Sequence, residues 1–127
     1  MLEFKVNVLE SEYKIVFGLR SELPDLKPEH SGETHFFKKL ILVCTEFGEE
    51  YTASEKSRVL KNIVLHELAH AFLYESGFDE LADDERLVSW IEIMIPKLIR
   101  KNDEVLKMFV DHDTTGLLNL APCNLAN

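Results

Sequence analysis

Residues 2–17 contain two stretches in which apolar and polar residues alternate. The apolar positions are Leu2, Phe4, Val6 and Val8 in the first stretch, and Tyr13, Ile15 and Phe17 in the second. A period of two places every second side chain on the same face of a strand. The pattern therefore predicts two strands, each with one buried face, joined by a hairpin turn at residues 10–12.

Residues 18–35 contain two glycines and two prolines, and they predict a surface loop with at most a short helical turn. The unbroken apolar run Leu40–Val43 follows, and its residues favour strands. It predicts a strand over residues 40–45 that is covered on both faces.

A long helix is expected after this strand, from about Ala53 to Ser76. Thr52 and Glu55 have the spacing of a capping box, in which each side chain satisfies a free amide of the first turn. Neither proline nor glycine interrupts the segment until Gly77, which suits the left-handed residue that often ends a helix.

A second helix is expected to begin near Asp83 or Asp84, either of which can cap it. Its apolar stripe consists of Leu87, Val88, Ile91, Ile95 and Leu98. Pro96 should kink or restart this helix, because proline removes one backbone donor. A short helix around residues 104–110 should follow, and residues 111–127 predict a loop and a peripheral tail.

The chain has 127 residues, of which 46% are hydrophobic, and both values are typical of one globular domain. The patterns predict an α+β fold in which a small sheet of about three strands packs on the long helix, within a single domain over residues 1–127. Charged Glu3 and Lys5 interrupt the N-terminus, and no apolar run could span a membrane. Cys44 and Cys123 lack C-x-x-C spacing, so we expect a cytoplasmic protein in a reducing compartment.

The formal net charge of −9 at pH 7 repels phosphate backbones and anionic lipid. Lys97, Arg100 and Lys101 near the end of the second helix are explained more simply by its dipole than by a nucleic-acid patch. We therefore expect neither nucleic acid nor a membrane as a partner.

His66 and His70 are four residues apart on the predicted long helix. Four residues rise about 6 Å and turn about 40° beyond one full turn, so both imidazoles can bind one Zn²⁺. Glu67 is rotated by about 100° from His66 and does not easily act as a further ligand. It can instead take a proton from zinc-bound water and pass it to the leaving amine of a peptide bond. The pattern predicts a zinc peptidase, and the alternative is a helix interface with two structural histidines and a solvated Glu67.

A catalytic zinc site needs a third protein ligand. The third histidine of metzincins would fall at position 76, which is Ser76, so that class does not fit. The acidic candidates are Asp79, Glu80, Asp83, Asp84 and Glu85. Glu85 is favoured, because the first turn of the second helix can direct a carboxylate back toward the histidines. Asp84 is the next candidate.

The stretch Val64-Leu65-His66-Glu67-Leu68-Ala69-His70-Ala71-Phe72-Leu73-Tyr74-Glu75-Ser76-Gly77 resembles small zincins carried by phages and mobile elements, which are similar to the ImmA/IrrE group of metallopeptidases. Asp84-Glu85-Arg86-Leu87-Val88 resembles the second helix of that group, although Val88 stands where alanine is expected. The resemblance covers roughly residues 1–100 and is specific over 64–88. It implies a minimal zincin-like fold, with His66, His70 and Glu85 as zinc ligands and Glu67 as the general base.

Zincins commonly hold an extended substrate against the edge of their sheet. The strand over 40–45 is the natural cradle if it lies beside the long helix, and the alternative is that it is only a core strand. The side chains whose chemistry could stabilise an oxyanion are Tyr51, Tyr74, His35 and His112, although each has a simpler structural or exposed interpretation, and zinc itself can act instead. The cluster Asp111–Asp113 is interpreted as a solvated loop, because three adjacent residues rarely converge on one ion.

Three functions are compatible with these residues. The first is a zinc peptidase that hydrolyses a protein or peptide substrate; in the group it resembles, such enzymes are linked to the removal of repressors or other regulators. The second is a zinc-stabilised, non-catalytic binding or regulatory protein, for which Glu67 has no use. The third is a SprT-like DNA-associated protease, which the acidic charge and the lack of a zinc ribbon disfavour.

Overall fold

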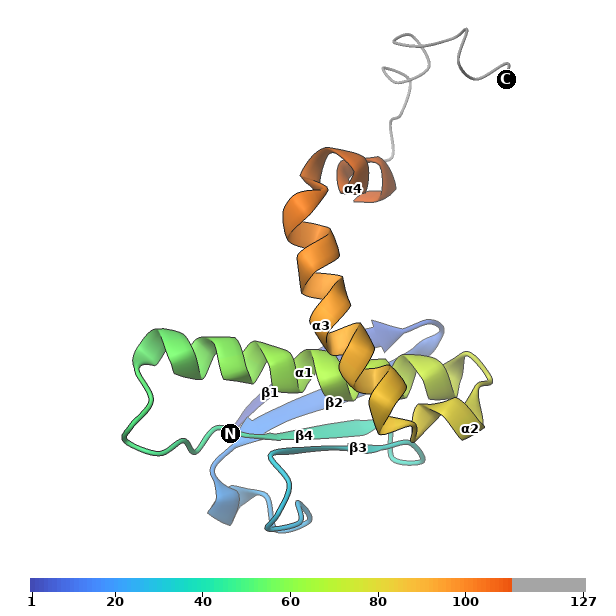
Figure 1. Ribbon diagram of the computed structural model, residues 1–127. Coiled ribbons are helices and arrows are strands. Elements are labelled where there is room, and N and C mark those ends of the chain that lie inside the picture. Colours follow the sequence, from blue (N-terminus) through green and yellow to red (C-terminus); the bar gives the residue numbers. More distant parts are fainter. Residues whose placement is uncertain (111–127) are drawn as a thin grey trace, which may run out of the picture. The chain divides into compact units, whose positions relative to one another are not determined.

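The computed structural model describes residues 1–110, which form an α+β fold with a four-stranded mixed sheet, a long helix and further helices (Figure 1). The strands are β1 (Leu2–Val8), β2 (Ser11–Gly18), β3 (Gly32–His35) and β4 (Leu40–Cys44). The helices are a 3₁₀ turn η1 (Arg20–Glu22), α1 (Ala53–Glu75), α2 (Asp79–Ala82), α3 (Glu85–Lys101) and α4 (Asp103–Val110).

The sheet has the strand order β1-β2-β4-β3. β1 and β2 form the predicted antiparallel hairpin, but the turn lies at Leu9 and Glu10, before the predicted position. Leu9 has a φ of 56°, a left-handed conformation that side chains rarely adopt, so no sequence signal marked this turn. β4 pairs parallel with β2 and antiparallel with β3, which makes the sheet mixed.

β3 is a strand that the sequence did not predict, because residues 18–35 were expected to form a loop and about three strands were expected in all. Its four residues, Gly-Glu-Thr-His, show no apolar alternation. These residues therefore form a strand because they pair with β4, and not because of their own strand propensity. It follows that β4 is an internal strand and that β3 is the edge. Residues 40–45 therefore form a core strand, as the alternative interpretation had it, and not the edge that an extended substrate would need.

β4 is buried on both faces, as its apolar run predicted. Leu2 and Phe4 of β1 are exposed, so the buried face predicted for that strand is limited to its end at Val6 and Val8. On one face the core residues are Val8, Tyr13, Ile15, Ile41 and Val43, against which Leu60, Ile63, Val64, Leu68 and Ala71 of α1 pack. On the other face Val16, Leu42 and Cys44 pack against Leu23 and Leu26, which lie between η1 and β3. The segment expected as a surface loop therefore covers the second face of the sheet.

α1 begins and ends as the sequence predicts. The Thr52 side chain accepts a hydrogen bond from the amide of Glu55, and the Glu55 carboxylate accepts one from the amide of Thr52. Gly77 adopts a φ of 85° just beyond the helix, a conformation that glycine allows without steric cost. These local signals place His66–His70 in the second half of α1.

α3 begins after Asp84, whose carboxylate accepts hydrogen bonds from the amides of Arg86 and Leu87. The short helix α2 before it was not predicted. Pro96 lies inside α3, which continues to Lys101, so the expected restart of the helix does not occur. A single proline removes only one donor, and the residues around it favour helix.

Residues 1–92 form one compact unit, and its boundary with the second unit lies inside α3, after Glu92. The sheet, α1, α2 and the first turns of α3 belong to the first unit. The single domain over residues 1–127 stays a prediction, and the predicted loop at Asp111–Asp113 lies outside the described residues. Within residues 1–110, no helix is both long and apolar enough to cross a membrane.

Glu75 at the end of α1 ties this helix to the sheet. Its carboxylate accepts hydrogen bonds from the hydroxyls of Ser11 (3.1 Å) and Tyr13 (3.0 Å) and pairs with the ammonium group of Lys39. Burial raises the pKa of the Tyr13 phenol above its ordinary value. The Lys39 ammonium, followed by the two hydroxyls, lowers the pKa of the Glu75 carboxyl, so the charged form of Glu75 stabilises the fold.

Glu75→Gln should lower the free energy of unfolding at pH 7 by roughly 1 kcal/mol, because Lys39 is partly exposed and solvent screens the pair. The pKa of Glu75 is lower in the folded than in the unfolded chain. Its contribution is therefore complete above the unfolded pKa of about 4.3 and is lost as the pH falls through the folded pKa. Urea unfolding of both proteins at neutral and at acidic pH measures this difference, which should shrink in acid.

Glu10→Gln is the matched control, since it removes one carboxylate from an exposed turn. An equal loss of stability in this control would contradict the assignment, as would a Glu75→Gln effect that does not change with pH.

Candidate metal centre

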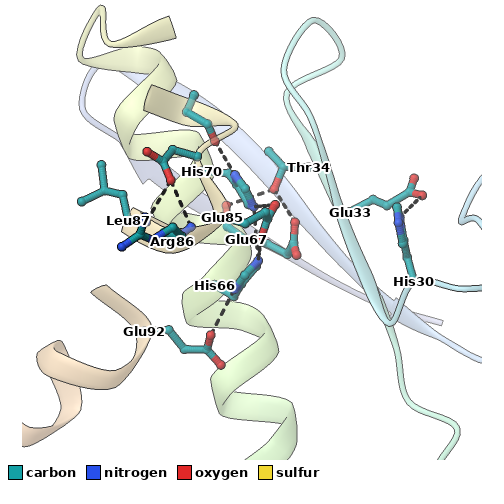
Figure 2. A network of polar contacts seen from close by, with 12 residues as sticks. His30, Glu33, Thr34, His66, Glu67, His70, Glu85, Arg86, Leu87 and Glu92 are labelled. Atoms are coloured by element: carbon teal, nitrogen blue, oxygen red, sulfur yellow. Dashed lines mark hydrogen bonds and ion pairs between the residues drawn. The ribbon is translucent and has the colours of Figure 1, made fainter. Parts of the chain in front are cut away.

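α1 presents His66 and His70 on successive turns, and their rings approach each other (Figure 2). The two Nε2 atoms are 3.2 Å apart, and the ring planes are inclined at 71°. His70 is buried, whereas His66 is partly exposed. The four-residue spacing thus brings the two imidazoles together, as the sequence predicted.

The outer nitrogen of each ring is held by a hydrogen bond. Nδ1 of His70 donates to the carbonyl oxygen of Ala82, at the end of α2. Nδ1 of His66 donates to the carboxylate of Glu92 in α3, at 3.0 Å. Because a neutral imidazole carries one hydrogen, both Nε2 atoms face each other as electron-pair donors.

Glu85, from the first turn of α3, completes the group. One of its carboxylate oxygens lies 3.0 Å from Nε2 of His66, and the other lies 3.2 Å from Nε2 of His70. Asp84, the other candidate third ligand, directs its carboxylate to the amides of α3 and caps that helix. The structure therefore brings Glu85, and not Asp84, to the two histidines.

Ligand atoms of His66, His70 and Glu85 all lie within 4.8 Å of one another, so this group can hold a metal ion. Such a convergence of imidazole nitrogens and a carboxylate favours a positive charge between them, which a bound metal ion or a proton on one Nε2 can supply. Within residues 1–110 no other such group of three or more histidine, cysteine or acidic residues occurs.

Glu67 lies beside this group and is buried, with 6% of its surface exposed. The hydroxyl of Thr34 lies 2.9 Å from its carboxylate and 3.0 Å from its main-chain carbonyl oxygen. Burial raises the pKa of the Glu67 carboxyl, and the Thr34 hydroxyl and the two histidines oppose this effect. Glu67 is thus held by β3 on one side and faces the histidines on the other (Figure 2).

Gly32 allows β3 to approach α1 this closely. A Cβ atom at this position would lie 2.8 Å from Cγ2 of Ile63 and 3.1 Å from Cγ of Glu67. Real side chains essentially never show the first of these distances, so any other residue would push β3 away from α1. Thr34 reaches Glu67 only because Gly32 has no side chain.

A cavity of about 690 Å³ connects these elements. The metal-binding group and Glu67 line it together with β3, Ile63 and the segment before β3. The acidic side chains that line it are Glu29, Glu33, Glu67, Asp83, Glu85 and Glu92. The candidate metal centre therefore opens into a space large enough for several residues of a bound chain.

The predicted oxyanion-stabilising residues are not all near the centre. Tyr74 stacks on Phe36 with ring centroids 4.3 Å apart, and neither Tyr74 nor Tyr51 lines the cavity. His35 lines it, but its Nε2 is bound to Glu33 at 3.0 Å. His112 lies outside the described residues.

Sequence reasoning missed Thr34 and Glu92. Thr34 lies on the unpredicted strand, so no pattern placed it near α1. The position of Glu92 could have been predicted, because it follows Glu85 by seven residues on the same helix. Seven residues end within about 20° of two full helical turns, which puts both carboxylates on one face of α3.

Asp84→Ala and Glu85→Ala should differ in their effects: one removes a helix cap, and the other removes a zinc ligand. Glu85→Ala should weaken zinc binding by more than the roughly 10–100-fold typical of an outer-shell change, because a ligand is lost. Asp84→Ala should retain zinc and lose about 1 kcal/mol of stability through the lost helix cap. Zinc content after dialysis and urea unfolding of the metal-free proteins provide the two measurements.

The wild-type protein should bind one zinc per chain in this experiment. Zinc lost from Asp84→Ala but retained in Glu85→Ala would exchange the roles of the two residues. Absence of zinc from the wild type would contradict the metal centre itself.

A scan against models of known protein families gave no match, and searches of curated proteins and of solved structures gave none either.

Proposed function

We propose that the protein is a zinc-dependent peptidase that hydrolyses a peptide bond in a protein substrate. One observation supports this most strongly: His66, His70 and Glu85 converge in the cavity that also contains the buried carboxylate of Glu67. A structural metal site has no need of a fourth, acidic group that is buried but free of the ion.

Zinc is the ion that these ligands suit. Two imidazole nitrogens and one carboxylate, with one position left open, make up a common catalytic zinc site. Two atoms that each lie 2.0–2.1 Å from one tetrahedral zinc are about 3.3 Å apart. Nε2 of His66 lies 3.2 Å from Nε2 of His70 and 3.0 Å from one Glu85 oxygen, both close to this value, and the other Glu85 oxygen lies 3.2 Å from Nε2 of His70.

The chemistry follows from the positions of the groups. A bound zinc would supply a Lewis acid that polarises the substrate carbonyl and makes a water molecule more acidic. Glu67 accepts the proton as the water oxygen forms its bond to the carbonyl carbon. Glu67 then delivers this proton to the amide nitrogen as the carbon–nitrogen bond breaks, which leaves a carboxylic acid and an amine.

Thr34 supports this role of Glu67. Its hydroxyl has one hydrogen and two acceptors within 3.0 Å, the carboxylate and the main-chain carbonyl oxygen of Glu67. It can therefore stay in contact with Glu67 while the carboxylate gains and loses a proton. The side chain of the base is therefore held in place against the edge strand.

The free edge of β3 is the proposed cradle for the substrate. The amide of Cys44 donates a hydrogen bond of 2.9 Å to the carbonyl oxygen of Ser31, which lies just before β3. Because antiparallel ladders alternate, the main-chain groups of Gly32 and Thr34 are directed to the other side, where the sheet has no further strand within residues 1–110. An extended peptide that paired there would lie beside Glu67 and the metal centre.

These features agree with the minimal zincin-like fold that the resemblance to the ImmA/IrrE group implies, and we propose membership of that class. The proposed substrate is a segment of protein chain in the cytoplasm, and neither nucleic acid nor a membrane has a part in the reaction.

Glu67→Gln should abolish cleavage and retain zinc, because the amide has the same shape but cannot accept the proton. A library of short unstructured peptides, incubated with zinc-loaded protein and read by mass spectrometry, measures cleavage. The expected loss is at least about 100-fold, since general bases contribute roughly 10²–10⁴-fold.

His70→Ala is the matched control, which should lose both zinc and cleavage. Equal cleavage by the wild type and Glu67→Gln would show that Glu67 is not the base. A wild type that binds zinc and cleaves no peptide of the library would favour the non-catalytic, zinc-stabilised protein.

A further inference from the structure

We infer that Glu92 is a positioning residue that selects the zinc-binding tautomer of His66 and so sets the affinity of the centre for metal. This inference rests on the metal site of the proposed function and does not depend on peptide hydrolysis.

The contact between the two side chains supports this role. The Glu92 carboxylate accepts a hydrogen bond from Nδ1 of His66 at 3.0 Å, and both side chains are less than a third exposed. A carboxylate has no hydrogen to give, so the hydrogen of this bond belongs to the imidazole. The single hydrogen of a neutral His66 is thereby kept on Nδ1, and Nε2 remains free to bind metal.

The two histidines obtain this support in different ways. His70 donates to a main-chain carbonyl, that of Ala82, which any residue at that position would supply. His66 depends on one side chain, that of Glu92. If Glu92 were removed, Nδ1 of His66 would have no acceptor among the described residues, and the imidazole could place its hydrogen on Nε2 instead. That nitrogen could then donate to Glu85 and would no longer bind metal.

α3 supplies both acidic groups, because Glu85 and Glu92 lie two turns apart on one face of the helix. Glu85 faces the inner nitrogens of both histidines, whereas Glu92 binds the outer nitrogen of His66 (Figure 2). The same stretch of helix therefore places a ligand and orients the ring of another ligand.

Outer groups of this kind typically change metal affinity by 10–100-fold. Glu92→Ala should therefore weaken zinc binding by about 10–100-fold in competition with a chromogenic chelator. Glu92→Gln should weaken it by less, because the amide oxygen can still accept the hydrogen of Nδ1. Glu29→Gln is the matched control, since Glu29 lines the same cavity and forms no hydrogen bond to either histidine in the described chain.

A second measurement does not require metal. Nitrogen-15 NMR of the metal-free protein at about pH 8, above the ordinary pKa of histidine near 6.5, distinguishes the two tautomers of His66. The wild type and Glu92→Gln should carry the hydrogen on Nδ1, and Glu92→Ala should shift toward the Nε2 form. Should Glu92→Ala fail to fold, Glu92→Met fills a similar volume without an acceptor and takes its place.

Three results would overturn the inference: zinc affinity of the Glu92→Ala protein within twofold of the wild type, an equal loss in Glu29→Gln, or a wild-type His66 that carries its hydrogen on Nε2. A wild type that binds no zinc would refute the proposed function. The tautomer measurement would still decide whether Glu92 orients His66.

Discussion

The rotation of α1 about its own axis is the constraint on which the site depends. Leu60, Val64, Leu68 and Ala71 recur at steps of three and four residues and are packed on the sheet. This burial fixes the helix phase, so that Glu67, which precedes Leu68, must turn to the edge strand, and the histidines must turn to α2 and α3. A change in the apolar stripe would therefore rotate every functional group at once, whereas the network around Glu75 only anchors the end of the helix.

The charges around the two histidines determine which kind of ligand the cavity can bind. Glu67, Glu85 and Glu92 gather around two histidines whose outer nitrogens both donate, so the inner side of the group presents only electron pairs and negative charge. Glu85 also helps to raise the pKa of the Glu67 carboxyl. Such an arrangement is unfavourable in a partly buried space until a cation balances it. The hydrogen bonds that orient both histidines and the acidic surroundings thus favour a cation in this space.

The parts of this structure that could be predicted from sequence are those that local periodicity determines. The hairpin strands, β4 and both ends of α1 follow from alternation, apolar runs and capping residues. β3 could not be predicted, because Gly32 and Thr34 belong to a strand only through pairing with β4, which is a tertiary effect. Thr34 was missed for that reason, whereas Glu92 was missed although its spacing from Glu85 was readable. The group of His66, His70 and Glu85 could be predicted, because helix geometry brings the two histidines together and the start of the next helix places the carboxylate.

The positions that break the ordinary rules of folding are gathered at one place. Glycine weakens a strand, a buried carboxylate is costly, and adjacent carboxylates repel one another. Gly32, Glu67 and the pair Glu67 and Glu85 show these three features around a single cavity. Gly32 is needed for the close approach of β3 to α1, whereas an apolar residue in place of Glu67 would avoid the cost of burying a carboxylate there. Stability alone therefore does not explain the acidic residues, whereas a cation held by His66, His70 and Glu85 would compensate their charge.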